Sequence, residues 1–217
     1  MRAVCAALSP CGVFADIGCD HGFFTEYMLE ENLCERAYIS DISAKCLRKA
    51  ENLLREHIAA GRVKSFCCAG FDLVPRDTEE ALIAGMGGDE TADILEAGFF
   101  PPVLVLQPMR NTVRVRRLLL SRGYAITTDR TVRDGKFYDI LRAERDGVFR
   151  GYGEAEIVFG YDNLHAPEAD FFEYIQVEKK KCRMRMDAAG KPVEELAERY
   201  RMLSEAENEA GRNLREN

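Results

Sequence analysis

Hydrophobic and polar positions alternate in two ways along the first two thirds of the chain. Short apolar or β-branched runs predict buried strands, and longer stretches with apolar residues three or four apart predict amphipathic helices. Strands are expected at Val13–Ile17, Ala37–Ser40, Val63–Cys67, Ala81–Ala84 and Val103–Leu106. Helices are expected between them at Phe23–Glu31, Ala44–His57, Glu90–Ala97 and Thr112–Arg122. This alternation is typical of a parallel sheet with helices on both faces.

The pattern changes after Gly123. Tyr124–Arg130 and Lys136–Ala143 are both strand-like, and the turn signal Arg133-Asp134-Gly135 between them predicts an antiparallel pair. The expected fold class is therefore α/β, with a Rossmann-like seven-stranded sheet whose last pair is antiparallel. The sheet of class I methyltransferases ends in this way, whereas the sheet of the nucleotide-binding dehydrogenases ends parallel.

Residues 168–217 predict two helices that form a C-terminal α-helical hairpin. Apolar side chains share one side of the first helix, which Gly190 and Pro192 end: Phe171, Tyr174, Ile175 and Cys182. A three-four spacing marks the second helix, in which Glu207 interrupts an apolar series of Val193, Leu196, Tyr200, Leu203 and Ala210. We expect a methyltransferase-like domain over residues 1–148 and a coiled-coil-like helical domain over residues 149–217.

Composition limits the class of protein. The chain has 217 residues, of which 47% are hydrophobic and 31% charged, and no apolar run is long enough to span a membrane. No signal peptide precedes the first domain-like residues, so a soluble, cytoplasmic protein is expected. A net charge of −7 argues against a globally basic nucleic-acid binder but leaves room for a local basic face.

Cysteine and histidine usage argues against a metal site. The chain has three histidines and no CxxC pair among its eight cysteines, whereas closed zinc sites draw on such short ligand pairs. Most of the cysteines are expected to be small buried hydrophobes in a reducing compartment: Cys5, Cys11, Cys19, Cys34, Cys46, Cys67, Cys68 and Cys182.

The stretch VFADIGCDHGFF, from Val13 to Phe24, has the form of a nucleotide-binding turn. Gly18 supplies the first glycine of a G-x-G-x-x-G pattern, but Asp20 and Phe23 occupy the second and third glycine positions. A carboxylate at this turn repels a pyrophosphate. S-adenosylmethionine carries no phosphate and has a net positive charge, so an acidic turn attracts it.

Two further features fit this interpretation. Asp16-x-Gly18-x-Asp20-x-Gly22 matches the first methyltransferase motif, and Asp41 follows the second strand, where an acid accepts hydrogen bonds from a ribose. The alternative is a plain strand-turn-helix with surface acids. The loops IAGMGG and LQPMRN each follow a strand, so they are expected to converge with the opening turn on one crevice.

The segments ADIGCDHG, IAGMGG, LQPMRN and DGKFYDIL together resemble the bacterial tRNA (adenine-N1)-methyltransferase family that modifies adenine 22 in the D-arm. The match runs from about Val13 to Ala143, and the helical tail is of the kind that this family carries. The resemblance implies a class I methyltransferase fold, S-adenosylmethionine as donor and tRNA as acceptor.

The resemblance implies roles for the residues of these motifs, and the placement of basic residues adds candidates for RNA contact. The expected cofactor-binding residues are Asp16, Gly18, Asp20, Gly22, Asp41, Ile42, Ala69, Gly70, Ala84, Gly85, Met86 and Gly87. The expected catalytic residues are Asp20, His21, Gln107 and Pro108. The expected tRNA-contacting residues are Gly88, Met109, Arg110, Asn111, Arg114, Arg117, Lys180, Lys181 and Arg183.

Three departures from the family pattern change these expectations. After the third strand the family has an acidic GDGL-like stretch, whereas this chain has Cys68-Ala69-Gly70-Phe71, so Asp72 or backbone groups are the alternatives for the adenine contact. Met109 stands where many members have asparagine. The chain also begins close to its first helix, where the family has a short polar leader that is expected to affect tRNA docking.

The chemistry expected of such a site is mainly alignment, because the sulfonium is already a good leaving group. Adenine N1 lies on the Watson–Crick edge, so the base must leave its stack and enter a pocket, which the Gly85–Gly88 and Gln107–Asn111 loops are expected to form. Gln107 is expected to hydrogen-bond the base edge, with Met86 or Met109 against its face. Asp20 or His21 is expected to accept a proton from the exocyclic amine or to balance the charge on the methylated ring. The alternative for His21 is a capping or packing role at the start of the first helix.

Two basic segments are candidates for RNA contact. Arg110, Arg114 and Arg117 lie on one stripe of a helix, opposite the apolar Val115, Leu118 and Leu119, and they form either a phosphate-binding row or a solvated face. The run from Lys179 to Arg185 either clamps tRNA or is a solvent-facing side that Glu194, Glu195 and Glu198 neutralise. A monomer is expected.

Two rival functions remain open from the sequence. The same cofactor turn serves a methyltransferase that acts on a small molecule or a protein. A non-catalytic RNA-binding relative on a decayed scaffold is the other alternative, because Ala69 replaces an acid.

Overall fold

The structure is a computed structural model that describes residues 1–145, 151–189 and 193–216. Contacts divide it into two compact units: Met1–Thr128 with Ile140–Arg150, and Asp129–Asp139 with Gly151–Asn217. The tip of the last β-hairpin therefore groups with the C-terminal helices. The predicted domain boundary after residue 148 and the helix-ending Gly190 and Pro192 lie outside the described residues.

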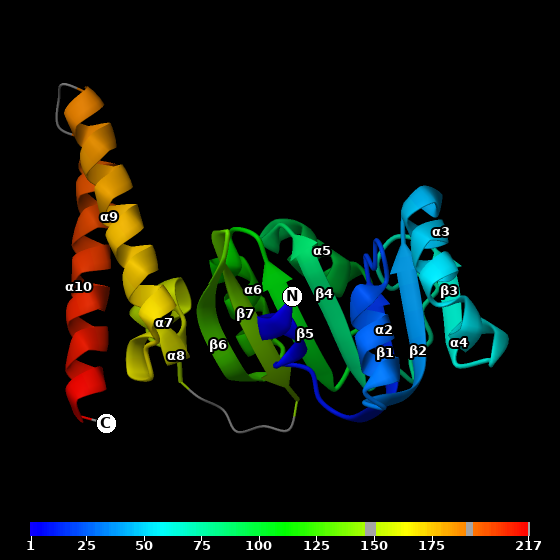
Figure 1. Cartoon of the computed structure of the whole chain (residues 1–217). Coiled ribbons are helices and arrows are strands. Elements are labelled where there is room, and N and C mark those ends of the chain that lie inside the picture. Colours follow the sequence, from blue (N-terminus) through cyan, green and yellow to red (C-terminus); the bar gives the residue numbers. More distant parts are fainter. Residues whose placement is uncertain (146–150, 190–192, 217) are drawn as a thin grey trace. The chain divides into compact units, whose positions relative to one another are not determined.

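The first unit is built on strands in the order β3-β2-β1-β4-β5-β7-β6. Their bounds are β1 Cys11–Ile17, β2 Cys34–Asp41, β3 Val63–Cys67, β4 Glu80–Met86, β5 Val103–Pro108, β6 Ala125–Asp134 and β7 Lys136–Glu144. The first five strands run parallel, and β7 pairs antiparallel with β5. The predicted seven-stranded α/β sheet with an antiparallel end is confirmed (Figure 1).

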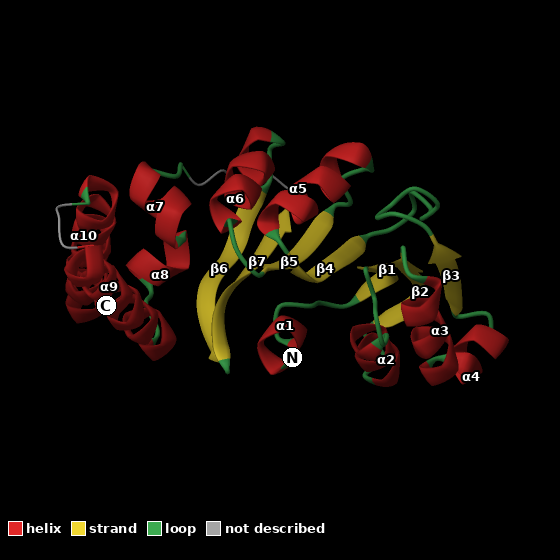
Figure 2. Ribbon diagram, turned by 90° about the horizontal axis from the view of Figure 1, so that it is seen from above, coloured by secondary structure: helices red, strands yellow, loops and turns green. Residues whose placement is uncertain are grey.

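Helices cover both faces of this sheet. On one face lie α2 Phe23–Glu30, α3 Ala44–Leu53 and α4 Arg55–Ala59, and on the other lie α5 Gly88–Ala97 and α6 Thr112–Ser121, as Figure 2 shows. The short α1 Arg2–Cys5 precedes the sheet. The central strands are apolar because both of their faces are buried; the side chains of Phe14, Ile39, Leu82 and Leu106 are fully enclosed.

Most predicted elements differ from the structure by a few residues at their ends, and two differences change the path of the chain. The single helix expected at Ala44–His57 is divided into α3 and α4 at Leu54, whose ψ of 13° leaves the helical range while its side chain is fully buried. The turn expected over Arg133–Gly135 is tighter, because β6 continues to Asp134 and only Gly135, with φ 71°, separates it from β7.

The second unit contains α7 Glu154–Phe159, α8 Tyr161–His165, α9 Ala169–Ala189 and α10 Glu194–Glu216. The long pair α9 and α10 is the expected hairpin, and its core includes Phe171, Ile175, Cys182, Leu203 and Ala210. The short helices α7 and α8 were not expected, because neither is long enough to show a clear period in the sequence.

Within this unit, side chains cover the part of the edge strand β6 that belongs to it, from Asp129 to Asp134. Backbone N–H groups of Asp129, Thr131 and Arg133 donate to side-chain oxygens of Asp162, Asn163 and Asp170, each over 2.9 Å. Exposed strand edges invite pairing with other chains, so these contacts satisfy the edge and protect it.

Candidate active site

The larger of two cavities in the first unit lies where the loops after the parallel strands meet. Its volume is about 510 Å³. The residues that line it come from the loops after β1, β2, β3, β4 and β5 and from α5. Eight of the residues expected at the site are among them: Gly18, Asp41, Ile42, Ala69, Gly70, Met86, Gly87 and Arg110.

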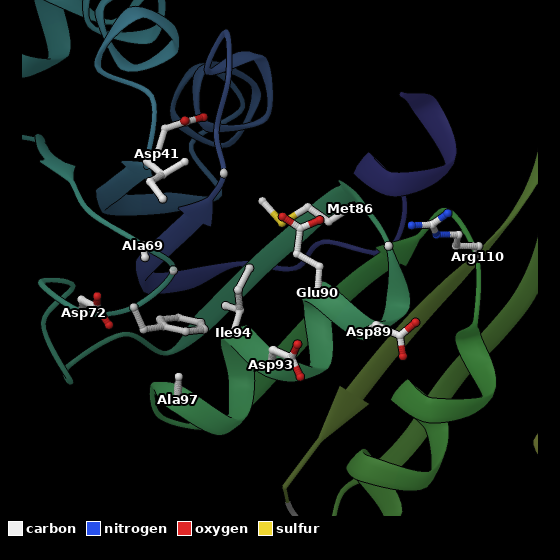
Figure 3. Close-up of a pocket in the computed structure, with 15 residues that line it drawn as sticks. Asp41, Ala69, Asp72, Met86, Asp89, Glu90, Asp93, Ile94, Ala97 and Arg110 are labelled. Atoms are coloured by element: carbon white, nitrogen blue, oxygen red, sulfur yellow. The ribbon is translucent and has the colours of Figure 1, made fainter.

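Acidic side chains dominate the charge of this larger cavity. Besides Asp41 it is lined by Asp72, Asp89, Glu90 and Asp93, and the one basic side chain among the described lining residues is Arg110. Figure 3 shows Asp41 on the other side of the cavity from the acids of α5. The sequence reasoning missed those acids, although a helix that starts directly after the IAGMGG loop must border the same crevice. The excess of carboxylates favours a cationic ligand.

Gly18 lies at the centre of the opening turn. Its backbone is left-handed, with φ 72°, and its N–H donates to the Ser40 carbonyl over 2.8 Å. A Cβ at this position would lie 1.9 Å from the terminal methyl carbon of Met86. Glycine is favoured here because L side chains rarely adopt this backbone conformation, and a larger residue would also require the Met86 side chain to move.

Asp41 connects the loop after β2 to the opening turn. Its Oδ1 accepts from the Ser43 N–H over 2.7 Å, and its Oδ2 accepts from the Asp20 N–H over 3.2 Å. The carboxylate is therefore fixed in place while it still borders the larger cavity. An ionised carboxylate has about four acceptor positions, so capacity for further hydrogen bonds remains.

A smaller cavity of about 210 Å³ adjoins the larger one, and Gly18 lines both. Residues expected at the site also include Asp16, Asp20, His21, Ala84, Gly85 and Gln107 on its walls. The other lining residues are Met1, Cys19, Phe23 and Phe24, none of which was expected to be functional. The smaller cavity is thus lined by aromatic rings, an amide and a few acids.

Asp16 is a buried acid at the end of β1, with only 3% of its surface exposed. Burial raises the pKa of its carboxyl to about 6, and the nearby Asp41 adds to this, while hydrogen bonds from Thr25 oppose it. The Thr25 hydroxyl donates to Asp16 Oδ2 over 2.9 Å. A cation bound nearby stabilises the ionised form of this group.

The pKa of the Asp20 carboxyl is shifted in the opposite direction, below its usual value. Burial raises the pKa of its carboxyl slightly, but hydrogen bonds from Cys46, Lys49 and His21 outweigh this and hold the pKa below its usual value. Lys49 Nζ lies 3.1 Å from Asp20 Oδ1, and His21 Nδ1 lies 2.8 Å from Oδ2. Asp20 is therefore ionised at neutral pH, and it adopts a left-handed backbone with φ 41°.

Gln107 lies at the end of β5 and is 7% exposed. Its Oε1 accepts from the Gly85 N–H over 3.0 Å, which fixes the amide and connects the loops after β4 and β5. Its Nε2 lies 3.2 Å from the sulfur of Met109, which is a weak acceptor. The amide N–H group can therefore exchange this thioether for a stronger acceptor.

Comparison with known proteins identifies the family. Residues 1–141 match the family model described as a methyltransferase domain. The chain belongs to this methyltransferase family. It is 36% identical over 153 residues to a candidate tRNA methyltransferase of Mycoplasma pneumoniae, a match that covers 68% of the chain and 70% of that protein.

Two further similarities confirm the resemblance inferred from the sequence motifs. The methyltransferase is 30% identical over 148 residues to the tRNA (adenine(22)-N(1))-methyltransferase of Bacillus subtilis, covering 64% of the chain and 62% of that enzyme. Its fold matches a candidate tRNA (m1A22) methyltransferase of Streptococcus pneumoniae, solved in complex with S-adenosyl-L-methionine. The TM-score is 0.84 at 21% identity, over 95% of the chain and 97% of that structure.

Several expected site residues of this methyltransferase do not line either of the two cavities. Gly22 is the N-cap of α2, and Pro108 ends β5. Gly88 lies beneath the next loop, since a Cβ there would lie 2.4 Å from the Asn111 carbonyl oxygen. Asn111 donates to Asp89 over 2.7 Å, and Met109 is 43% exposed. Gly88 and Asn111 therefore hold the loops after β4 and β5 together, whereas Met109 lies at the surface.

Of the expected basic stripe of Arg110, Arg114 and Arg117, only part is available to contact RNA. Val115, Leu118 and Leu119 are buried as predicted. Arg114, however, contacts Asp89, Asp93 and Glu96 on α5, so three carboxylates surround its guanidinium. Arg117 is exposed, and Arg110 lines the larger cavity.

Acids also neutralise part of the basic run on α9. Lys179 pairs with Glu207 over 2.8 Å, and Lys181 pairs with Glu178 over 2.6 Å. The acids expected to do this were Glu194, Glu195 and Glu198, but Glu198 pairs with Arg201. Arg183 lies over the Tyr200 ring at 5.0 Å, and Lys180 is exposed.

Residues 1–145, 151–189 and 193–216 contain no group of three or more His, Cys, Asp or Glu placed to hold a metal ion. Within the same residues, no helix has both the length and the apolar character needed to cross a membrane. All eight cysteines are free, and four of them are buried: Cys5, Cys19, Cys34 and Cys182.

Proposed function

We propose that this chain transfers a methyl group from S-adenosylmethionine to N1 of an adenine in tRNA, at position 22 of the D-arm. The observation that carries the proposal is the pairing of an acidic larger cavity with a smaller aromatic one, joined at Gly18. The family match and the names of the two curated relatives support the reaction and the acceptor.

The larger cavity fits the cationic donor. Asp41 is in position to accept hydrogen bonds from the ribose, and Ile42, which is 78% exposed, offers an apolar face to the adenine ring. Ala69 and Gly70 line the same cavity, and Asp72, further along the same loop, supplies an acid in place of the one that Ala69 replaces. Gly87 and Gly18 allow the backbone to approach the amino-acid end closely.

S-adenosylmethionine, when bound, supplies a methyl group on a positively charged sulfur. The N1 lone pair forms the new N–C bond as the S–C bond breaks, so the positive charge passes from the sulfur to the methylated base. Asp20, which is ionised, and Asp16 both line the smaller cavity into which this charge moves. Gln107 orients the base through its Nε2–H, which donates to a ring nitrogen other than N1 and leaves the N1 lone pair free to attack, since its Oε1 is already engaged by Gly85.

The proposed acceptor contacts begin at Arg110, which lines the larger cavity, and continue beyond the cavities. Arg110 is the leading candidate for a phosphate contact, because Arg114 is already surrounded by carboxylates. We assign methyl transfer to residues 1–148 and RNA docking to residues 149–217, where Lys180 and Arg183 are exposed. The monomeric state and the cytoplasmic location stay predictions.

The experiment is methylation of an unmodified tRNA pool with methyl-labelled donor, followed by nucleoside analysis. We expect labelled N1-methyladenosine, and no label when position 22 carries guanine. Label in other nucleosides, or transfer only to small molecules or protein, would contradict the proposed acceptor. No binding of the donor by calorimetry would favour a non-catalytic relative.

A further inference from the structure

Two aromatic rings at the opening turn lie parallel. The ring centroids of His21 and Phe23 are 5.4 Å apart and their planes differ by 1°. This separation is inside the roughly 4.5–7 Å range of stacked aromatic pairs. Both residues line the smaller cavity. The pair therefore forms a flat aromatic surface beside Gln107.

The Phe23 ring is not buried in the protein core. Phe23 is 49% exposed although it begins α2, whose Met28 and Leu29 are fully buried. Burying a phenylalanine contributes about 2 kcal/mol, so a half-exposed one at a cavity is a candidate contact surface. The side chain of His21 is 45% exposed as well.

The surface is held in place before any ligand binds. His21 Nδ1 lies 2.8 Å from Asp20 Oδ2, and Lys49 holds the other carboxylate oxygen at 3.1 Å. The left-handed backbone of Asp20 directs the chain into this arrangement. Holding a ring in its bound orientation lowers the entropy cost of binding.

We propose that the His21–Phe23 pair is the stacking platform for the adenine that leaves the tRNA stack. A flat base with an uncharged aromatic face fits parallel rings, and aromatic side chains are the usual partners of unstacked bases. The Asp20 carboxylate beside the rings disfavours a phosphate at this position. Gln107, on the wall of the same cavity, contacts the base edge while the rings contact its face. This inference rests on the proposed function, and it adds the His21–Phe23 surface, which the proposed function does not include.

The test compares Phe23→Ala with Phe23→Tyr and with Leu73→Ala. Leu73 is a matched control, because it is 60% exposed and lines neither of the two cavities. Stacking contributes about 1–3 kcal/mol per base, so Phe23→Ala is expected to lower kcat/KM for tRNA at least about fivefold. Phe23→Tyr is expected to recover most of the loss, and Leu73→Ala to cause none.

Two further measurements separate stacking from other roles. The affinity for S-adenosylmethionine is expected to be unchanged in Phe23→Ala. The slope of log affinity for tRNA against log salt is also expected to be unchanged, because no phosphate contact is lost. Wild-type kcat/KM in Phe23→Ala, a reduced salt slope, or an equal loss of donor affinity would each overturn the platform. Wild-type protein that leaves tRNA unmethylated would instead contradict the proposed function, and it is measured first.

Discussion

The two cavities that meet at Gly18 differ in what lines them. The larger one has five carboxylates and, among its described lining residues, one guanidinium, whereas the smaller one has the rings of His21, Phe23 and Phe24 and the amide of Gln107. The comparison teaches that the charge of the larger cavity selects the cationic donor, whereas the shape of the smaller cavity selects the flat adenine. Substitutions in the two cavities should therefore affect different measurements.

The largest effect is expected from Asp41→Ala in the larger cavity. Hydrogen bonds to a charged group contribute about 1.5–3 kcal/mol, so loss of the carboxylate is expected to weaken S-adenosylmethionine binding about 100-fold in calorimetry. The affinity for tRNA is expected to stay unchanged. Asp41→Asn, which retains one acceptor oxygen, serves as the control and is expected to lose less. Equal losses of donor and tRNA affinity would show that the cavities are not independent.

Gln107→Glu tests the smaller cavity. The variant retains an acceptor for the Gly85 N–H and removes the N–H group available to the base. We expect kcat for tRNA methylation to fall about 30-fold, since an orienting hydrogen bond of about 2 kcal/mol is lost. Donor affinity is expected to be at least as tight as in the wild type. An unchanged kcat would remove Gln107 from the proposed site.

The pH dependence of donor binding is the exception to this separation, because it depends on Asp16, which lines the smaller cavity two residues before the shared Gly18. Burial raises the pKa of the Asp16 carboxyl to about 6, and a bound cation favours the ionised form, so binding releases a proton near this pH. Donor affinity is expected to fall about tenfold between pH 7 and pH 5. Asp16→Asn is expected to give a flat profile, and a wild-type profile without a step near pH 6 would contradict this role.

The same pKa sets the direction of the stability change. The raised pKa means that, between pH 3.8 and about pH 6, the folded state holds a proton that the unfolded state releases. The contribution of the neutral carboxyl is therefore fully present below pH 3.8 and lost as the pH rises to about 6. Asp16→Asn removes this pH-dependent contribution to the free energy of unfolding.

The smallest effects are expected at the basic residues. Arg110→Ala is expected to lower the slope of log tRNA affinity against log salt by about 1, because one phosphate contact is lost. Arg114→Ala is expected to leave the slope unchanged, since three carboxylates already neutralise its charge. Filter binding over a salt series measures both slopes. A larger slope change for Arg114→Ala than for Arg110→Ala would reverse this assignment.

The sequence predicted the strands and their loops well for a physical reason. Buried parallel strands are continuous apolar runs, and the ligand loops follow from the position of each strand end. Asp41, Gly18 and Gln107 could be placed in this way. The break at Leu54 and the short helices α7 and α8 could not, because they depend on packing rather than on a period.

Contacts between neighbouring helices could not be predicted from the sequence either. The stripe of Arg114 was visible, but the three acids that surround it come from α5, and no pattern within α6 reports them. The same holds for Lys179, whose partner Glu207 lies on the other helix of the hairpin. The exposure of Phe23 could not be predicted either, since a phenylalanine at the start of a helix is usually buried.

The central claim is that an acid-lined cavity beside Gly18 takes a cationic donor without phosphates. The most direct measurement is calorimetric titration of the intact protein at pH 7 with S-adenosylmethionine and, separately, with NAD. We expect binding of S-adenosylmethionine, its loss in Asp41→Ala, and no binding of NAD. Binding of NAD that Asp41→Ala also weakens, with no binding of S-adenosylmethionine, would contradict the account.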